Sequence, residues 1–586
     1  MDRTLDKAGL WDLFKRRAVI ATDLPPGPTR DIAYQVNEAE GRGDATLRTK
    51  AEYSALFDAL LRAESATAGG VLTLRDNGQL TNAGQAIEDY LKVAVDTDEF
   101  FDHPMYAVHV TGWPANAMQP EQPVDAPAGA RLEVWRIDPA DAQPNPAPGA
   151  EGVLFSSPTF SLVNSGNRTL RVPKRSWKVN LEAHGADGRL VGMSRLNLKA
   201  MFNDPAQMRE TLSWALFDAS GVPACRHSYA RLAFDWRYLG LFFLVQQVDK
   251  AFLSDHFGGN DKGNLYKAAC ADIGCATLEH RVGDGGDDGG RQYYRDGPAD
   301  RRTYLLKTNE EDRAANTYDD LAAFVRAING VGLPGGDGAF DTDAFRESVE
   351  GIMNAPAFLR WAGVNVLVGS WDNYFATPAN YYLYNSGRKG AAADFVSKPY
   401  FTFLPWDYDN SFGIDYFGTQ WQYADLLDWP ASTAAYLRKN GSKSARSRIP
   451  LVTNLLANHD FRQYYLDHVE HLLDTHFNPK AITDQIGPDP GTGLWERVRH
   501  AAYLEAESPT GPAFTGRQFT NDEVYRAGYQ QSELWHGEAH VEGIVNFVRM
   551  RHDRAREQLA KLRAEYPRGA SGASFTGVME ALPGHR

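Results

Sequence analysis

Residues 371–384, WDNYFATPANYYLY, and residues 399–413, PYFTFLPWDYDNSFG, hold the pattern that decides the fold. The apolar run before them predicts a helix over 355–370, and their aromatic runs predict two strands joined by a turn over 380–406. Polar side chains stand where these elements end. They are Asp372 after the helix, Asn380 at the opening of the first strand, and Asp407 and Asp409 at the end of the second.

These four side chains have the chemistry of a metal and phosphate site. Side chains two residues apart in an extended chain point the same way, so Asp407 and Asp409 can face one site. If 381–384 pairs with 400–406, Asn380 comes close to Asp407. Carboxylate and amide oxygens suit Mg²⁺ or Mn²⁺ shared with phosphate. Phosphoryl transfer needs such ligands and one carboxylate that orients the attacking hydroxyl. A plain strand-ending turn at Asp407 is the structural alternative.

The chain before this stretch is rich in predicted strands. The sequence predicts strands over 103–112 and 131–137, two strands with a turn between them over 161–182, and a hairpin over 228–248 that turns at Asp235-Trp236-Arg237. One helix is expected in this half, over 205–219.

Helical periodicity dominates after residue 316, with helices predicted over 317–329, 341–351, 355–370, 447–478 and 537–565. A β-rich half followed by a helical half is the order of a bilobal protein-kinase-like fold. The predicted class is therefore α+β. We expect an N-terminal accessory region over 1–100, a kinase-like N-lobe over 101–250, and a C-lobe with loop insertions and C-terminal helices over 251–586.

The accessory region shows no sign of chemistry. The spacing of Leu56, Phe57, Leu60 and Leu61 predicts one helix, and a second is expected from Gln85 to Val95. Asp76-Asn77-Gly78 predicts a turn.

A second candidate cluster lies in VPKRSWKVNL, residues 172–181. Its apolar residues alternate with polar ones, so one strand face carries Lys174 and Lys178. Kinases hold a phosphate-binding lysine with a helical glutamate. Glu210, early in the predicted helix, makes Lys178–Glu210 the preferred pair, with Lys174 as the alternative lysine. Gly166, in the turn before this strand, is the candidate phosphate cover, and the chain has no Walker-type GxxxxGK[ST] motif.

Composition limits the classes of partner. The 586 residues carry a net charge of −14, which disfavours binding to nucleic acid or to an anionic membrane. No stretch reaches the ~20 apolar residues of a spanning helix. Residues 1–19 hold no apolar run long enough for a signal peptide, which predicts a cytoplasmic location. A secreted or surface-associated location stays open.

Other polar groups have plainer readings. The acidic, glycine-rich run at 283–288 predicts a solvated loop rather than a calcium site. The basic stretch at 438–448 is expected to be a solvated loop. A binding site for an acidic or phosphorylated partner is the alternative. His468, His471 and His476 are expected to be surface or satisfied histidines. Three cysteines form no disulfide framework, although Cys270 and Cys275 could form one bridge.

Seven segments, in this order along residues 103–565, together resemble the CotH family. They are GNRTLRVPKRSWKVNL, MRETLSWALFDASGVP, YLGLFFLVQQVDKAFL, GNLYK, LLKTNEED, WDN…NYYLY and LPWDYDNSFG. The family is known for atypical protein kinases that phosphorylate spore-coat proteins on serine, and related members act as fungal surface invasins.

The resemblance assigns roles to residues of this chain. Asp372 matches the catalytic aspartate, Asn380 and Asp407 match the metal ligands, and Asp409 assists them. Lys178 with Glu210 would hold phosphates, and the strand at 244–249, with Gln246 and Val248, would form the hinge beside adenine. Two positions depart from the family: Gln246 stands where Glu is usual, and Ser165 where Arg is usual. The first bears on nucleotide contacts and the second on phosphate binding, where Arg168 or Arg171 could substitute.

The resemblance implies an ATP-dependent kinase that uses Mg²⁺ or Mn²⁺ and transfers the γ-phosphoryl group to Ser or Thr of a protein substrate. Adenylylation or glutamylation on the same fold is the second hypothesis, because each also needs a metal-bound triphosphate. A noncatalytic binding or adhesion protein is the third.

Overall fold

The computed structural model describes residues 3–5, 72–74, 80–82 and 85–86, and the chain from 97 to 568 with gaps. The gaps fall at 115–121, 142–144, 147, 167–169, 171–173, 183–189, 191–192, 236, 258–259, 270–275, 284–285, 297–302, 337, 388–394, 417, 430–448, 488–492, 508–524, 526, 529–533 and 537–538.

The chain forms two compact units. The first comprises Met1–Ala200, Arg226–Gln247 and Glu507–Arg517, and the second comprises Met201–Cys225, Val248–Ala506 and Gln518–Arg586. Both units contribute strands, and helices dominate the second, so the predicted α+β class is confirmed.

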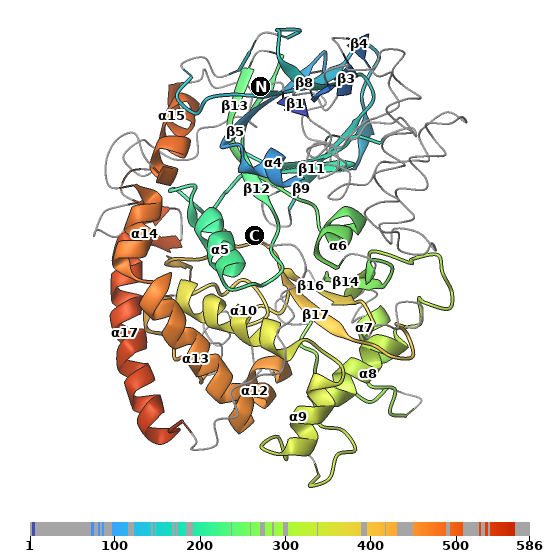
Figure 1. The fold of residues 1–586 in the computed structure, drawn as a ribbon, viewed down its shortest axis with the longest axis vertical. Coiled ribbons are helices and arrows are strands. Elements are labelled where there is room, and N and C mark those ends of the chain that lie inside the picture. The colour runs from blue at the N-terminus through green and yellow to red at the C-terminus, as the bar shows by residue number, and fades with distance from the viewer. Residues whose placement is uncertain are drawn as a thin grey trace. The chain divides into compact units, whose positions relative to one another are not determined.

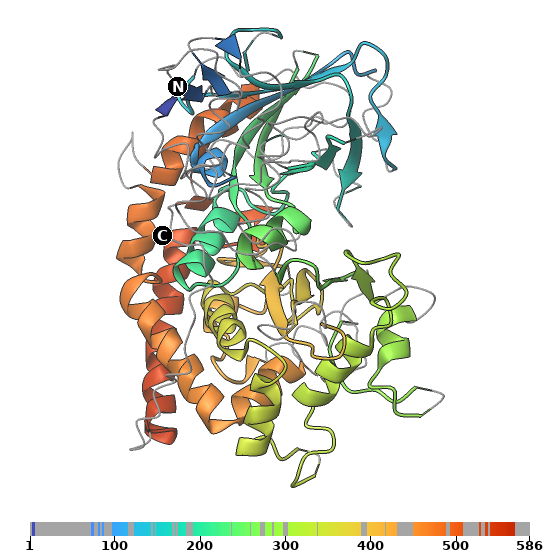
Figure 2. The same ribbon diagram turned by 45° about the vertical axis from the view of Figure 1, so that its right-hand side comes forward.

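The first unit is built on a nine-stranded sheet that curls, as Figures 1 and 2 show. The strand order is β6-β9-β10-β11-β13-β12-β5-β7-β8, and neighbours are antiparallel except the parallel pair β5–β12. The strands are β5 (Met105–Thr111), β6 (Val124–Asp125), β7 (Arg131–Arg136), β8 (Val153–Ser157), β9 (Ser161–Ser165), β10 (Ser176–Asn180), β11 (Arg195–Lys199), β12 (His227–Phe234) and β13 (Arg237–Val245).

The strands predicted in this unit are confirmed; β10 buries alternate residues, whereas β5, β12 and β13 are buried along nearly their whole length. Trp177 and Val179 of β10 lie in the core with Leu198 of β11 and Phe242 of β13. Helix α4 (Thr97–Asp102) packs its Phe100 ring on Tyr106 of β5, with 4.2 Å between ring centroids.

The described parts of the first hundred residues form a small antiparallel sheet. Its strands are β1 (Arg3–Leu5), β2 (Leu72–Leu74), β3 (Leu80–Asn82) and β4 (Gln85–Ala86). The helix predicted from Gln85 is wrong at its start, because Gln85 pairs with Asn82 across two strands. Backbone pairing with a neighbouring strand here overrides a weak helical pattern. The helix predicted around Leu56 and the turn at 76–78 lie outside the described residues.

The second unit holds the polar cluster at 371–413. Strands β14 (Asn264–Ala268), β15 (Tyr304–Leu306), β16 (Tyr381–Asn385) and β17 (Phe401–Pro405) form an antiparallel sheet in the order β15-β14-β16-β17. The predicted β16–β17 pairing is confirmed, with Tyr381 opposite Pro405. A smaller sheet joins β18 (Ile414–Asp415), β19 (Leu534–His536) and β20 (Ala539–Val541).

Helices supply most of the rest of this unit (Figure 1). They are α5 (Arg209–Ala219), α6 (Lys250–Phe257), α7 (Arg291–Asp296), α8 (Asp319–Ile328), α9 (Asp343–Glu350), α10 (Ala355–Val368), the 3₁₀ turn η8 (Trp421–Tyr423), α12 (Pro450–Ala457), α13 (His459–Thr475), α14 (Pro479–Ile486), α15 (Gly493–Glu507) and α17 (Ile544–Glu565).

Helix α10 is the centre of the second unit. Its mostly apolar sequence is buried along almost its whole length. Asn354 caps its start by accepting a hydrogen bond from the Ala357 amide, and Gly369, with φ of 64°, ends it. Asp372 therefore follows closely after a buried helix, which fixes the position of the chain at this point.

The start of α5 differs from the sequence prediction. The helix begins at Arg209 rather than at residue 205. The Asp204 carboxylate accepts hydrogen bonds from the Arg209 amide at 2.8 Å and from its guanidinium at 2.5 Å. This buried pair holds residues 204–208 in turns, so the helix starts late.

No helix in the described part of the chain has the length and apolar character that crossing a membrane demands.

Candidate functional site

Asp372 is held on both carboxylate oxygens. Thr377 Oγ1 donates to Oδ1 at 2.8 Å, and Asn410 Nδ2 donates to Oδ2 at 3.0 Å. The two bonds fix the orientation of the carboxylate.

Asn380 lies against the same residue. Its Nδ2 donates to the backbone carbonyl of Asp372 at 2.8 Å. This bond uses the side-chain nitrogen of Asn380. The side-chain oxygen Oδ1 of Asn380 is the atom whose chemistry suits a cation.

Asn380 and Asp407 share an unusual backbone conformation. Their φ angles are 51° and 68°, in the left-handed region. Asn and Asp tolerate this region better than other non-glycine residues, and such conformations gather at functional sites. The residue types at these positions match the backbone they must adopt.

The loop that carries Asp407 and Asp409 is anchored by the residue between them. Tyr408 is fully buried, and its amide donates to Glu210 Oε1 at 3.4 Å. Its ring packs edge-on against Trp214 of α5. Glu210 itself is 2% exposed. The structure thus places the predicted Glu210 against the loop of the predicted metal ligands.

Both loops of the site are tied to one residue of α10, the buried Asn365. The Tyr408 hydroxyl donates to Asn365 Oδ1 at 3.2 Å and accepts from Trp361 Nε1 at 2.6 Å. Asn373, which follows Asp372, donates to the same Oδ1 at 2.8 Å. Burial raises the pKa of the Tyr408 hydroxyl well above its usual value, so it remains a neutral donor.

A polar chain that the sequence did not reveal leads into the site. Tyr416 donates to Asn203 Oδ1 at 2.5 Å, and Asn203 Nδ2 donates to Asn410 Oδ1 at 2.8 Å. Asn410 then donates to Asp372. The only signal in the sequence is the position of Asn410 directly after Asp409. Asn203 and Thr377 carry no comparable pattern.

The donor types fit a magnesium or manganese ion shared with phosphate. Among the described residues there is no group of three or more His, Cys, Asp or Glu that could hold a metal by itself. Magnesium is usually bound through one or two carboxylates with phosphate oxygens and water. Asp407, Asp409 and the Asn380 amide oxygen are donors of that kind.

The predicted lysines lie in the first unit. Lys178 is half-buried on β10, between Val163 of β9 and Asn197 of β11. Lys174 is 4% exposed, and its Nζ donates to the Leu241 carbonyl at 2.7 Å. Lys174 therefore has an internal partner. Glu210 belongs to the second unit, and the Lys178–Glu210 pair stays a prediction.

The remaining predicted nucleotide contacts are placed as follows. Gly166 has φ of 124°, a conformation that favours glycine. Gln246 is buried in the first unit, where its Oε1 accepts from the Arg226 amide at 3.3 Å. Val248 is buried in the second unit. Their roles toward a nucleotide stay predictions.

The other polar groups have mixed outcomes. His468 is half-buried, and desolvation lowers its pKa to about 3, so it is neutral. Cys225 is buried. Cys270, Cys275, Arg168, Arg171 and the basic stretch at 438–448 lie outside the described residues.

Comparison with known proteins agrees with the motifs. A family model described as CotH kinase protein matches residues 163–553. The inner spore coat protein H of Bacillus subtilis is 23% identical over 316 residues, which cover 54% of this chain and 70% of that protein. Invasin CotH2 of Rhizopus delemar is 21% identical over 341 residues, which cover 57% of this chain and 49% of that protein. The family match spans more than half of the sequence and includes every residue of the candidate site, and we conclude that the chain belongs to the CotH kinase protein family.

Proposed function

We propose that this protein is an atypical kinase with a bilobal kinase-like fold. It binds ATP with Mg²⁺ or Mn²⁺ and transfers the γ-phosphoryl group to a Ser or Thr hydroxyl of a protein substrate. The observation that carries the proposal is the Asn410 bridge. One residue of the Asp407–Asp409 loop holds the Asp372 carboxylate at 3.0 Å, so a candidate base and candidate metal ligands share one rigid framework.

Each residue then has a defined task. Asp372, oriented by Thr377 and Asn410, accepts a hydrogen bond from the substrate hydroxyl and takes its proton as the oxygen attacks phosphorus. Asp407, Asp409 and the Asn380 amide oxygen would hold the divalent ion. When bound, that ion neutralises charge on the phosphate oxygens. Glu210 keeps the metal-ligand loop in place through the Tyr408 amide.

The phosphate end of the nucleotide would be held by Lys178 and the Gly166 turn, and its base by the segment that contains Gln246 and Val248. The CotH family membership supports these assignments. The relative named an inner spore coat protein supports the surface-associated location that the sequence left open.

Two substitutions separate binding from turnover. Asp407→Ala is expected to abolish metal-dependent ATP binding, because it removes a charged ligand of the ion. Asp372→Ala is expected to leave binding close to wild type and to lower turnover by about 10²–10⁴-fold, the usual contribution of a general base. Calorimetric titration with ATP and Mn²⁺ measures the first effect, and release of ADP measures the second.

Asp428→Ala is the matched control, because Asp428 is an exposed carboxylate of the same unit. It should change neither quantity. Wild-type binding and turnover in both site variants would refute the proposed roles.

A further inference from the structure

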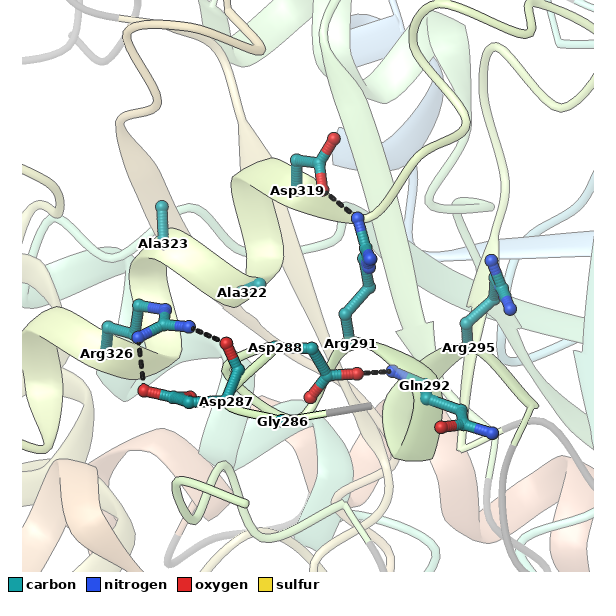
Figure 3. Close-up of a pocket in the computed structure, with 10 residues that line it drawn as sticks. All are labelled: Gly286, Asp287, Asp288, Arg291, Gln292, Arg295, Asp319, Ala322, Ala323 and Arg326. Carbon is teal, nitrogen blue, oxygen red and sulfur yellow. Dashed lines mark hydrogen bonds and ion pairs between the residues drawn. The ribbon is translucent and has the colours of Figure 1, made fainter. Parts of the chain in front are cut away.

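A polar pocket lies apart from the residues discussed above, in the second unit. It encloses about 590 Å³ between α7, α8 and the turn at residues 286–288 (Figure 3). Its charged lining residues are Asp287, Asp288, Arg291, Arg295, Asp319 and Arg326. The sequence predicted only a solvated loop at 283–288, since the basic partners lie on two later helices.

The carboxylate of Asp287 in the pocket already accepts hydrogen bonds from other groups of the protein. Asp287 Oδ1 accepts from the Gly289 amide at 3.0 Å and lies 2.7 Å from His280 Nε2, while its Oδ2 accepts from Arg326 at 2.6 Å. The Gly289 amide bond, followed by the contact with His280, lowers the pKa of Asp287 to about 2. Asp287 is therefore ionised and paired, which leaves it poorly suited to bind a cation.

The Asp288 carboxylate likewise accepts hydrogen bonds on both oxygens. Its Oδ1 accepts from the Gly290 amide and its Oδ2 from the Gln292 amide, each at 2.9 Å. Both bonds are made to backbone groups at the start of α7. Asp288 therefore serves to fix the turn and the helix, and with them Arg291.

The arginines have donors to spare. A guanidinium has five N–H donors. Arg291, 43% exposed, donates one described bond, from Nη1 to Asp319 at 2.6 Å. Arg295 uses Nε and Nη2 on Asp296 and keeps Nη1. Figure 3 shows Arg291 between Arg326 and Arg295 along the pocket. The pocket thus offers spare N–H donors from Arg291 and Arg295, beside the carboxylates of Asp287, Asp288 and Asp319 that balance the charge of its three arginines.

We propose that this pocket binds a phosphate monoester, and that its natural source is a phosphorylated serine or threonine of a protein. Arginine forks match phosphate oxygens, and a phosphate offers more acceptor positions than a carboxylate to the spare donors of Arg291 and Arg295 on α7. This site goes beyond the proposed kinase activity and does not depend on it.

Hydrogen bonds link this pocket to the framework of the candidate active site, which favours a protein ligand. Tyr294 of α7 donates to the Glu279 carbonyl at 2.5 Å. Two residues earlier, the Thr277 carbonyl accepts from Tyr374 at 2.8 Å, and the Ala276 carbonyl accepts from Tyr381 at 2.6 Å. Tyr374 and Tyr381 closely follow Asp372 and Asn380. A phosphoprotein held at the pocket would therefore be docked on the same framework.

The test is fluorescence-polarisation binding of a labelled peptide, Gly-Gly-phosphoserine-Gly-Gly, to the full chain, with inorganic phosphate as competitor. Arg291→Gln and Arg295→Gln should each weaken binding at least fivefold. Arg291→Lys, which keeps the charge but loses the fork, should also weaken it. Arg499→Gln is the matched control, because Arg499 is a similarly exposed arginine, 38%, paired with Glu496, and it should bind like wild type.

The outcomes separate the possible sources of the phosphate. Tighter binding of the phosphopeptide than of inorganic phosphate supports the protein ligand, and equal binding supports the site with a small phosphate compound as its source. Equal binding of a Gly-Gly-Asp-Gly-Gly peptide, an equal loss in Arg499→Gln, or no phosphate binding at all would overturn the proposal. Kinase activity in the same samples reports separately on the proposed function.

Discussion

At the scale of single residues, the candidate site depends on how Asp372 is held. Its two hydrogen bonds come from Thr377, five residues away, and from Asn410, on the loop after β17. Both donors are neutral side chains, and together they orient the carboxylate. A misplacement of about 1 Å at a reacting group can lower the rate of an enzyme about 100-fold.

Thr377→Val therefore tests positioning. It removes one donor, keeps the shape of the side chain, and is expected to lower kcat by about 10-fold to 100-fold with little change in KM for ATP. Steady-state kinetics measures the split between the two constants. Thr377→Ser, which keeps the hydroxyl donor, should have a kcat close to that of the wild type. Thr453→Val, at an exposed threonine of α12, should be silent. A rise in KM at constant kcat would argue against the positioning role.

Tyr408→Phe tests the support beneath the site. Without the hydroxyl, the buried Trp361 Nε1 loses its acceptor. A buried donor left without a partner costs about 1–3 kcal/mol, and we expect the free energy of unfolding to fall by that amount in urea denaturation. Tyr423→Phe is the control, because Tyr423 is 48% exposed. Equal stabilities of wild type and Tyr408→Phe would show that the network is not needed.

The site residues differ in how far the sequence could predict them. Asp372, Asp407 and Asp409 follow the ends of strongly apolar elements and Asn380 directly precedes one, so local pattern indicates all four. Asn203 meets Asn410 across 207 positions of sequence, and nothing local marks a contact of that kind. For Lys174 the local pattern was misleading. It placed the lysine on a polar strand face and gave no sign that its buried amine donates to the Leu241 carbonyl.

At the scale of elements, helix packing explains a glycine inside α10. A Cβ on Gly363 would lie 3.0 Å from His468 Cδ2 and 3.5 Å from Val469 Cγ2, both on α13. Glycine in a helix interior costs about 1 kcal/mol relative to alanine. The close approach of α10 and α13 explains why glycine is found at position 363 despite this cost.

Gly363→Ala is accordingly expected to destabilise the protein, although alanine is the better helix former. Overpacking of a buried contact costs about 1–3 kcal/mol, which outweighs the gain of about 1 kcal/mol in helix propensity. Chemical denaturation measures the difference. A variant more stable than wild type would show that α13 can shift, and that the contact does not fix α10.

Elements were predictable where the pattern was strong. The buried α10 was found from its apolar run, α8 from its helical period and β10 from its alternation. The start of α5 was missed because the Arg209–Asp204 pair is tertiary, and β4 was missed because its pairing partner decides its structure.

At the scale of the whole molecule, the CotH family match and the arrangement of the site point to the same chemistry. With a net charge of −14, the general field of the protein does not attract an anion, so the proposed nucleotide binding would depend on local groups, a metal ion and a lysine. Transfer of a phosphoryl group is the central claim.

The most direct test is incubation of the purified chain with Mn²⁺ or Mg²⁺ and ATP labelled at the γ position, beside ATP labelled at the α position. A serine-containing protein acceptor is included, and Asp407→Ala is the control. We predict transfer of label from the γ position only, in the wild type and not in Asp407→Ala. Transfer from the α position alone would show adenylylation instead, and failure to bind the nucleotide at all would contradict the enzymatic account.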